Sequence, residues 1–145
     1  MKFISSSYDP KTGVSHVTMQ HLGVKFTGTA RVHPMEHEKA SEYAGCAYAE
    51  TRAMIDALKY ERQLAKQKAD MALDFVKSCE CYSKFNKDDP SAKSMYRQLN
   101  QRIKRVNDLA DEINNLIRSL QTDISRREIV TKAIERRKNM TKQEN

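Results

Sequence analysis

The feature that most constrains this chain is an unbroken spacing of apolar residues in its second half. Eight apolar positions follow one another at alternating steps of four and three residues: Leu99, Ile103, Val106, Ala110, Ile113, Ile117, Leu120 and Ile124. A repeat of about 3.5 residues is that of a coiled-coil seam. At ~1.5 Å per residue, a helix of forty-odd residues reaches roughly 65 Å, longer than a small domain is wide. We therefore expect the seam to pack on an earlier helix or on another chain.

A long helical pattern also precedes the seam, over residues 41–85, and its first turns carry a stripe of small residues that permits close backbone approach. Residues 86–90 (NKDDP) break this helix, with Asp89 suited to cap the next one and Pro90 suited to its first position. The second helix is expected over residues 90–138, antiparallel to the first. The polar tail, residues 139–145, is expected to fray.

Residues 1–33 read as three short antiparallel strands joined by two tight turns, at residues 9–13 (DPKTG) and 21–23 (HLG). In the third strand one face carries Phe26, Gly28, Ala30 and Val32, and the other carries Lys25, Thr27, Thr29 and Arg31. Three strands alone are marginal, so the apolar face should pack on a helix. The prediction is a single α+β domain over residues 1–145, with a small N-terminal sheet, two long antiparallel helices and coiled-coil-like oligomerisation.

Composition points to the same assembly and to anionic partners. With 39% hydrophobic residues, 31% charged residues and no Trp, the core of one chain is thin, so we expect a homodimer or a larger homo-oligomer. The formal net charge of +7 favours an anionic ligand, although Lys and Arg also suit solvated helix faces. An odd number of cysteines without a signal peptide predicts a reducing cytoplasm, and no apolar run approaches membrane-spanning length.

One candidate site lies on the third strand. Gly28 lets another group approach the backbone, because glycine has no side chain in the way. On the neighbouring positions the hydroxyls of Thr27 and Thr29 and the guanidinium of Arg31 share a face and can hold an anion. These residues therefore predict a phosphate contact.

A second candidate lies at the turn between the helices, which holds Tyr82, Phe85 and Asn86, and at the beginning of the next helix, which holds Tyr96 and Asn100. An aromatic face and an amide are what a purine ring needs for stacking and for an edge hydrogen bond. In the alternative interpretation, Phe85 and Tyr82 only close the core of the helical hairpin.

Other functional classes find little support. No catalytic signature, phosphate-binding glycine loop or metal-ligand spacing is present, and the histidines and Cys79-Glu80-Cys81 do not form a recognisable metal set. We therefore predict a protein that is not an enzyme and has no cofactor. Basic clusters on the second helix are interleaved with acids such as Asp108, Asp111 and Glu112, which argues against nucleic acid as a partner.

Three runs carry a resemblance to a known family: residues 8–13 (YDPKTG), 26–34 (FTGTARVHP) and 41–53 (SEYAGCAYAETRA). They resemble the first Thoeris anti-defence family, small phage proteins that act as sponges for an immune signal. The resemblance covers the sheet and the first helix, and the second helix only in general character. It implies a homodimer or larger oligomer that captures cyclic ADP-ribose variants, and in some members cyclic oligonucleotides.

The resemblance also implies a ligand held by arginine, an aromatic ring and an asparagine. Arg31 and Phe85 match the first two roles, and Asn100 and Arg118 are the candidates for the asparagine and a further basic residue. The leading hypothesis is a phage protein that sequesters such a nucleotide in the bacterial cytoplasm without degrading it. The alternative hypothesis is a coiled-coil adaptor or a nucleic-acid-associated phage protein, and a nucleotide hydrolase is a more distant third.

Overall fold

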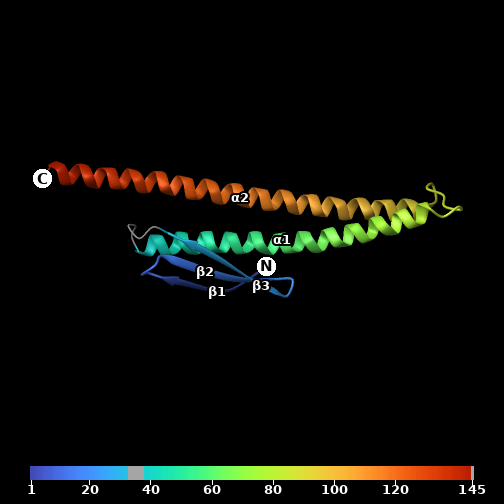
Figure 1. Ribbon diagram of the computed structural model, residues 1–145, viewed down its shortest axis with the longest axis horizontal. Helices are drawn as coiled ribbons and strands as arrows, with labels where there is room; N and C mark the ends of the chain where they lie inside the picture. The colour runs from blue at the N-terminus through green and yellow to red at the C-terminus, as the bar shows by residue number, and fades with distance from the viewer. Residues whose placement is uncertain (33–37, 145) are drawn as a thin grey trace. The chain divides into compact units, whose positions relative to one another are not determined.

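A computed structural model of the chain describes residues 1–32 and 38–144, and it confirms an α+β fold in which a three-stranded antiparallel sheet is followed by two long helices. The elements in chain order are β1 (Lys2–Asp9), β2 (Val14–His21), β3 (Val24–Arg31), α1 (Glu38–Glu80) and α2 (Pro90–Glu144). The strand order is β1-β2-β3 (Figure 1). His33 and Pro34, which end the predicted junction, lie outside the described residues.

Both turns of the sheet form where the sequence predicts them. In the first, the amide of Gly13 donates to the carbonyl of Asp9 at 2.8 Å, and the Asp9 carboxylate accepts from the amide of Lys11 at 2.9 Å. In the second, Leu22 and Gly23 both have positive φ, 52° and 77°. Two successive residues of positive φ match the twist of an antiparallel hairpin, which is why so short a connection suffices.

The predicted alternation of faces on β3 is confirmed. Gly28 and Ala30 are buried, whereas the neighbouring Thr27, Thr29 and Arg31 are exposed. On β2 the buried positions also alternate: Ser15, Val17 and Met19. Because β2 pairs with β3 over its whole length, these buried residues form one continuous surface, which is apolar except for Ser15.

This apolar surface lies against the first part of α1, as predicted (Figure 1). A side chain at Gly28 would run into the carbonyl oxygen of Ala49 and come within 2.6 Å of the amide nitrogen of Ala53. A side chain at Gly45 would likewise run into the hydroxyl oxygen of Ser15. The group that approaches Gly28 is therefore the backbone of α1, so this glycine serves helix packing.

The ends of the helices differ from the expected bounds. α1 ends at Glu80, before the predicted limit of Phe85, because the chain tightens there: the amide of Tyr82 donates to the carbonyl of Cys79, and that of Phe85 to the carbonyl of Tyr82. α1 also begins earlier, at Glu38, and α2 continues to Glu144 through the polar stretch that was expected to fray.

The start of α2 follows the prediction. The carbonyl of Asp89 accepts the first helical hydrogen bond, from the amide of Lys93, and Pro90 is the first helical residue. Proline fits this position because its missing amide proton would have had no helical partner. Before it, the side chain of Asn86 accepts from the amide of Asp88 at 3.0 Å, which shapes the turn.

The buried stripe of α2 follows the predicted seam except at Ile103 and Leu109. Leu99, Ile113 and Leu120 are buried as expected, but Ile103 is 42% exposed. Leu109, which the predicted seam omits, is completely buried. Both 109 and 110 satisfy a repeat near 3.5, so spacing alone did not identify which of the two faces inward.

The chain divides into two compact units, Met1–Asp56 with Asn114–Asn145, and Ala57–Ile113. In the second unit, the partners of Glu61, Lys68 and Glu80 on α1 are successively earlier residues on α2: Arg105, Arg102 and Tyr96. The helices of this unit are therefore antiparallel. Across the described residues, neither helix combines the length and apolar character needed to cross a membrane.

Candidate functional site

The first unit contains a half-open cavity of about 810 Å³ where the end of β3, the first part of α1 and the last part of α2 meet. This volume lies within the range of small-molecule pockets, roughly 300–1,000 Å³. Its charged lining comprises Arg31 and Arg52, Arg127 and Lys132, and Glu128 and Glu135. Among the described residues of the lining, four cations against two carboxylates give a formal charge of +2, which favours an anionic ligand.

Two arginines of the cavity are held in place by main-chain carbonyls. Arg31, the last residue of β3, donates from Nε to the carbonyl of Thr12 at 3.2 Å. Arg52, on α1, donates from one terminal nitrogen to the carbonyl of Thr29 at 2.7 Å. A guanidinium has five N–H donors, so each arginine retains donors for a ligand after making its bond to the backbone. Such anchoring lowers the entropy lost on binding.

The remaining walls supply a third guanidinium and an aromatic ring. Arg127 is half-buried, and this burial lowers the pKa of its guanidinium, which nevertheless stays charged at neutral pH. Tyr48, on α1, donates its hydroxyl to the carbonyl of Asp123 at 3.4 Å. Burial, followed by the negative charge of Asp123, raises the pKa of Tyr48, so the phenol is protonated at neutral pH. Within the described part of its lining, the cavity therefore offers the aromatic side chain of Tyr48 beside several cations.

Of the predicted site residues on the sheet, only Arg31 lines the cavity. The hydroxyl of Thr27 is 3.0 Å from that of Thr18, and the hydroxyl of Thr29 is 2.9 Å from Nδ1 of His16. Both pairs are cross-strand contacts on the exposed face of the sheet. Thr29 contributes to the cavity indirectly, through the carbonyl that anchors Arg52.

The other predicted residues lie elsewhere. Arg118 is exposed on α2 in the first unit and does not line the cavity. Phe85 and Asn100 belong to the second unit. Phe85 is half-buried and packs edge-on against Tyr96, with ring centroids 6.4 Å apart and an interplanar angle of 71°. This contact is the one expected if Phe85 closes the hairpin core.

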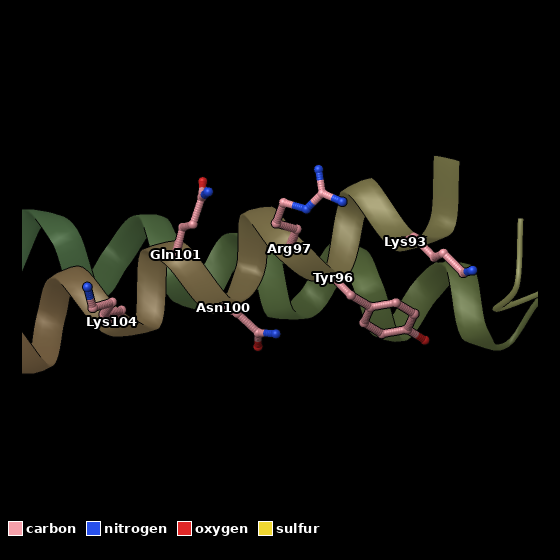
Figure 2. A pocket seen from close by; sticks show the side chains of 6 residues that line it. All are labelled: Lys93, Tyr96, Arg97, Asn100, Gln101 and Lys104. Carbon is pink, nitrogen blue, oxygen red and sulfur yellow. The ribbon is translucent and has the colours of Figure 1, made fainter. Parts of the chain in front are cut away.

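Asn100 lies on an exposed strip of α2 around a shallow hollow of about 430 Å³. We call this surface the Tyr96 strip; it consists of Lys93, Tyr96, Arg97, Asn100, Gln101 and Lys104. Figure 2 shows Tyr96 and Asn100 projecting on one side of the helix and Arg97 and Gln101 on the other. The strip contains both the amide and the aromatic ring that the sequence associates with a purine.

Sequence reasoning missed Tyr48, Arg52, Arg127 and Lys132. One signal was present, because Tyr48 and Arg52 are four residues apart and share a helix face. Their convergence with residues beyond position 120 depends on the return of α2, which spacing does not reveal. Among residues 1–32 and 38–144, no group of three or more His, Cys, Asp or Glu side chains is placed to hold a metal ion.

Comparisons with models of protein families, with curated proteins and with solved structures found no match to this chain.

Proposed function

We propose that this protein binds and sequesters a cyclic ADP-ribose-type signalling nucleotide in the cytoplasm of a phage-infected bacterium, without degrading it. The observation that carries the proposal is the cavity of the first unit, where Arg31, Arg52, Arg127 and Lys132 surround a space beside Tyr48. By capturing the signal, the protein would prevent activation of the host effector. The resemblance of residues 8–13, 26–34 and 41–53 to a phage anti-defence family supports the same function.

The cavity suits a diphosphate that carries an aromatic base. Anchored guanidiniums of Arg31 and Arg52 can each present a pair of N–H donors to phosphate oxygens, the geometry in which arginine binds phosphate best. The formal charge of +2 on the lining balances the two negative charges of a diphosphate diester. The ring of Tyr48 is the side chain available for stacking against a base.

Sequestration is favoured over hydrolysis by the chemistry of the lining. The described residues around this cavity include two carboxylates, Glu128 and Glu135, but no histidine to act as a base and no cysteine or serine to act as a nucleophile. Cations that bind diphosphate tightly in the ground state give affinity without turnover. A ligand-binding role remains a prediction from the sequence for five residues that do not line this cavity: Thr27, Thr29, Phe85, Asn100 and Arg118.

Titration calorimetry with cyclic ADP-ribose tests binding, and recovery of the nucleotide tests its fate. After heat denaturation of the complex, chromatography should return the nucleotide intact, whereas a hydrolase would release a linear product. Lys132→Gln and Arg52→Lys should weaken binding, by roughly 1.5–3 kcal/mol for each charged hydrogen bond lost. Arg126→Gln is the matched control, because Arg126 is exposed on the same helix and does not line the cavity. Equal affinities for all variants would remove this cavity from the proposal.

The alternative function, a coiled-coil adaptor, has one observation in its favour. The last part of α2 exposes four large apolar side chains: Ile129, Val130, Ile134 and Met140. A partner chain that covered them would bury apolar surface that otherwise contacts water. An adaptor would show no affinity for the nucleotide in the calorimetry described above.

A further inference from the structure

The Tyr96 strip, in the second unit, differs from the cavity of the first unit because no carboxylate is among its residues. Three of its six residues are cations, two are amides and one is aromatic, and none is a carboxylate (Figure 2). Lys93, Arg97 and Lys104 follow one another at intervals of one to two helical turns, so positive charge continues along the strip. At ~1.5 Å per residue the strip is roughly 16 Å long.

The aromatic residue of the strip is fixed before any ligand arrives. The hydroxyl of Tyr96 donates to a carboxylate oxygen of Glu80 at 3.0 Å, and the ring lies edge-to-face with Phe85. The hydrogen bond and the ring contact together restrict the orientation of the Tyr96 side chain. A ring that is already ordered loses little entropy when a base stacks on it.

The cations of the strip also make fewer or weaker ion pairs and hydrogen bonds than the neighbouring cations on α2. Arg105 pairs with Glu61, and Arg102 donates to the carbonyl of Lys68 at 3.2 Å. Within the described part of the chain, Lys93 and Arg97 form no ion pair. Lys104 lies 4.0 Å from Asp108, and both side chains are largely exposed to water, so this pair is weak.

We propose that the Tyr96 strip binds single-stranded nucleic acid through phosphates and a stacked base, chemistry that DNA and RNA share. The hollow is shallow and open, so it suits a strand that lies along the helix better than a small ligand that must be enclosed. At 3.4 Å or more per nucleotide, the strip accommodates roughly three to five nucleotides. Asn100 and Gln101 add donors and acceptors for base edges.

This proposal revises the expectation from sequence that interleaved acids exclude nucleic acid. The nearest acids after the strip, Asp108, Asp111 and Glu112, follow it along α2 and do not line the hollow. The six residues of the strip thus include no acid, and the carboxylates of Glu80 and Asp108 touch it only at the Tyr96 hydroxyl and at Lys104. The proposal does not depend on nucleotide capture by the cavity of the first unit.

Fluorescence anisotropy with labelled oligo(dT) and oligo(rU) tests the proposal. The wild-type protein should bind both probes, more tightly as their length rises towards the span of the strip. The logarithm of affinity should fall against the logarithm of salt concentration with a slope of roughly −2, as expected for three phosphate contacts to a single strand. Affinity that does not change with probe length, or that AMP abolishes at concentrations comparable to the probe, would indicate a mononucleotide site and overturn the proposal.

Two sets of variants distinguish binding at the strip from a general effect of the protein's net charge. The triple variant Lys93→Gln, Arg97→Gln and Lys104→Gln should lose most of the affinity and most of the salt dependence. The control replaces three exposed lysines on α1 of the same unit by glutamine, Lys59, Lys66 and Lys77, with an equal change in charge. Equal losses in the two triple variants would show that only net charge matters, and would refute the proposal.

The stacking contact has its own variant. Tyr96→Leu should weaken binding roughly tenfold, because base–aromatic stacking is lost. Tyr96→Phe retains the ring and should retain most of the affinity, even though its bond to Glu80 is removed. Circular dichroism establishes that each variant is folded. A folded Tyr96→Leu variant with wild-type affinity would rule out stacking on this ring and overturn the proposal.

Discussion

Replacing Gly28 by alanine probes the tightest contact between the sheet and α1. The new methyl group would meet the carbonyl oxygen of Ala49 and the amide nitrogen of Ala53. Both are backbone atoms of a helix, so neither can rotate away as the end of a side chain would. The sheet must therefore move off the helix, loosening the contacts of Val17 and Ala30, which are almost completely buried.

The expected cost follows from two opposing effects. Overpacking a core typically costs about 1–3 kcal/mol, and the upper part of this range applies because the obstructing atoms are backbone. Replacing glycine also restricts the unfolded chain, which returns about 0.4–1 kcal/mol. We expect a net loss of about 2 kcal/mol in the free energy of unfolding. For a chain of this size, this corresponds to a fall of roughly 4–8 °C in Tm.

Urea unfolding followed by circular dichroism measures this loss. Thr27→Ala is the control, because Thr27 is exposed on the opposite face and its hydroxyl lies 3.0 Å from that of Thr18. It should cost no more than about 1 kcal/mol. Combining Gly28→Ala with Ala49→Gly should restore nothing, because the obstruction at Ala49 is its carbonyl. A Gly28→Ala protein within about 0.5 kcal/mol of wild type would refute the close packing described here.

Four further predictions concern the helices and the ligand. Leu109→Ala should lose about 2–5 kcal/mol of stability, whereas Ile103→Ala, at a position 42% exposed, should lose clearly less; equal losses in chemical denaturation would contradict the observed phase of the buried stripe. Arg31→Ala should weaken nucleotide binding by roughly 1.5–3 kcal/mol in calorimetry while the protein remains folded, and unchanged affinity would exclude this side chain from the site. Phe85→Ala should lower Tm through loss of the edge contact with Tyr96; an unchanged Tm with affinity reduced by roughly 1–3 kcal/mol would instead identify Phe85 as a stacking residue. Sedimentation at micromolar concentration should show a homodimer or larger species, because large apolar side chains on α2 are exposed in the single chain, and a compact monomer would disprove it.

The candidate site could be predicted from sequence only in part. Arg31 was identified because a cation beside hydroxyls on a strand favours an anion, and it does line the cavity of the first unit. Its partners Arg52 and Arg127 were not identified, because they come from helix segments far apart in sequence. Thr27 and Thr29 had the right chemistry, but their hydroxyls face other polar groups across the sheet. Side-chain type predicts what a residue can bind, whereas its neighbours determine whether it is available.

Local features of the fold followed from the sequence alone. Alternation of polar and apolar residues predicted which face of β3 is buried, and turn residues such as Gly13 and Gly23 predicted where the strands reverse. Pro90 predicted the first residue of α2. Each of these depends on the backbone preferences of a few adjacent residues, so no tertiary information is needed.

Tertiary structure determined which partner each residue meets. Gly28 was expected to admit another group, but only the packed structure shows that this group is the backbone of α1. Similarly, a spacing near 3.5 predicts a buried stripe without fixing its phase, and packing selects Leu109 while leaving Ile103 partly in water. The physical reason is the same in both cases: a periodic pattern describes one element, whereas burial depends on the surface that a second element brings against it.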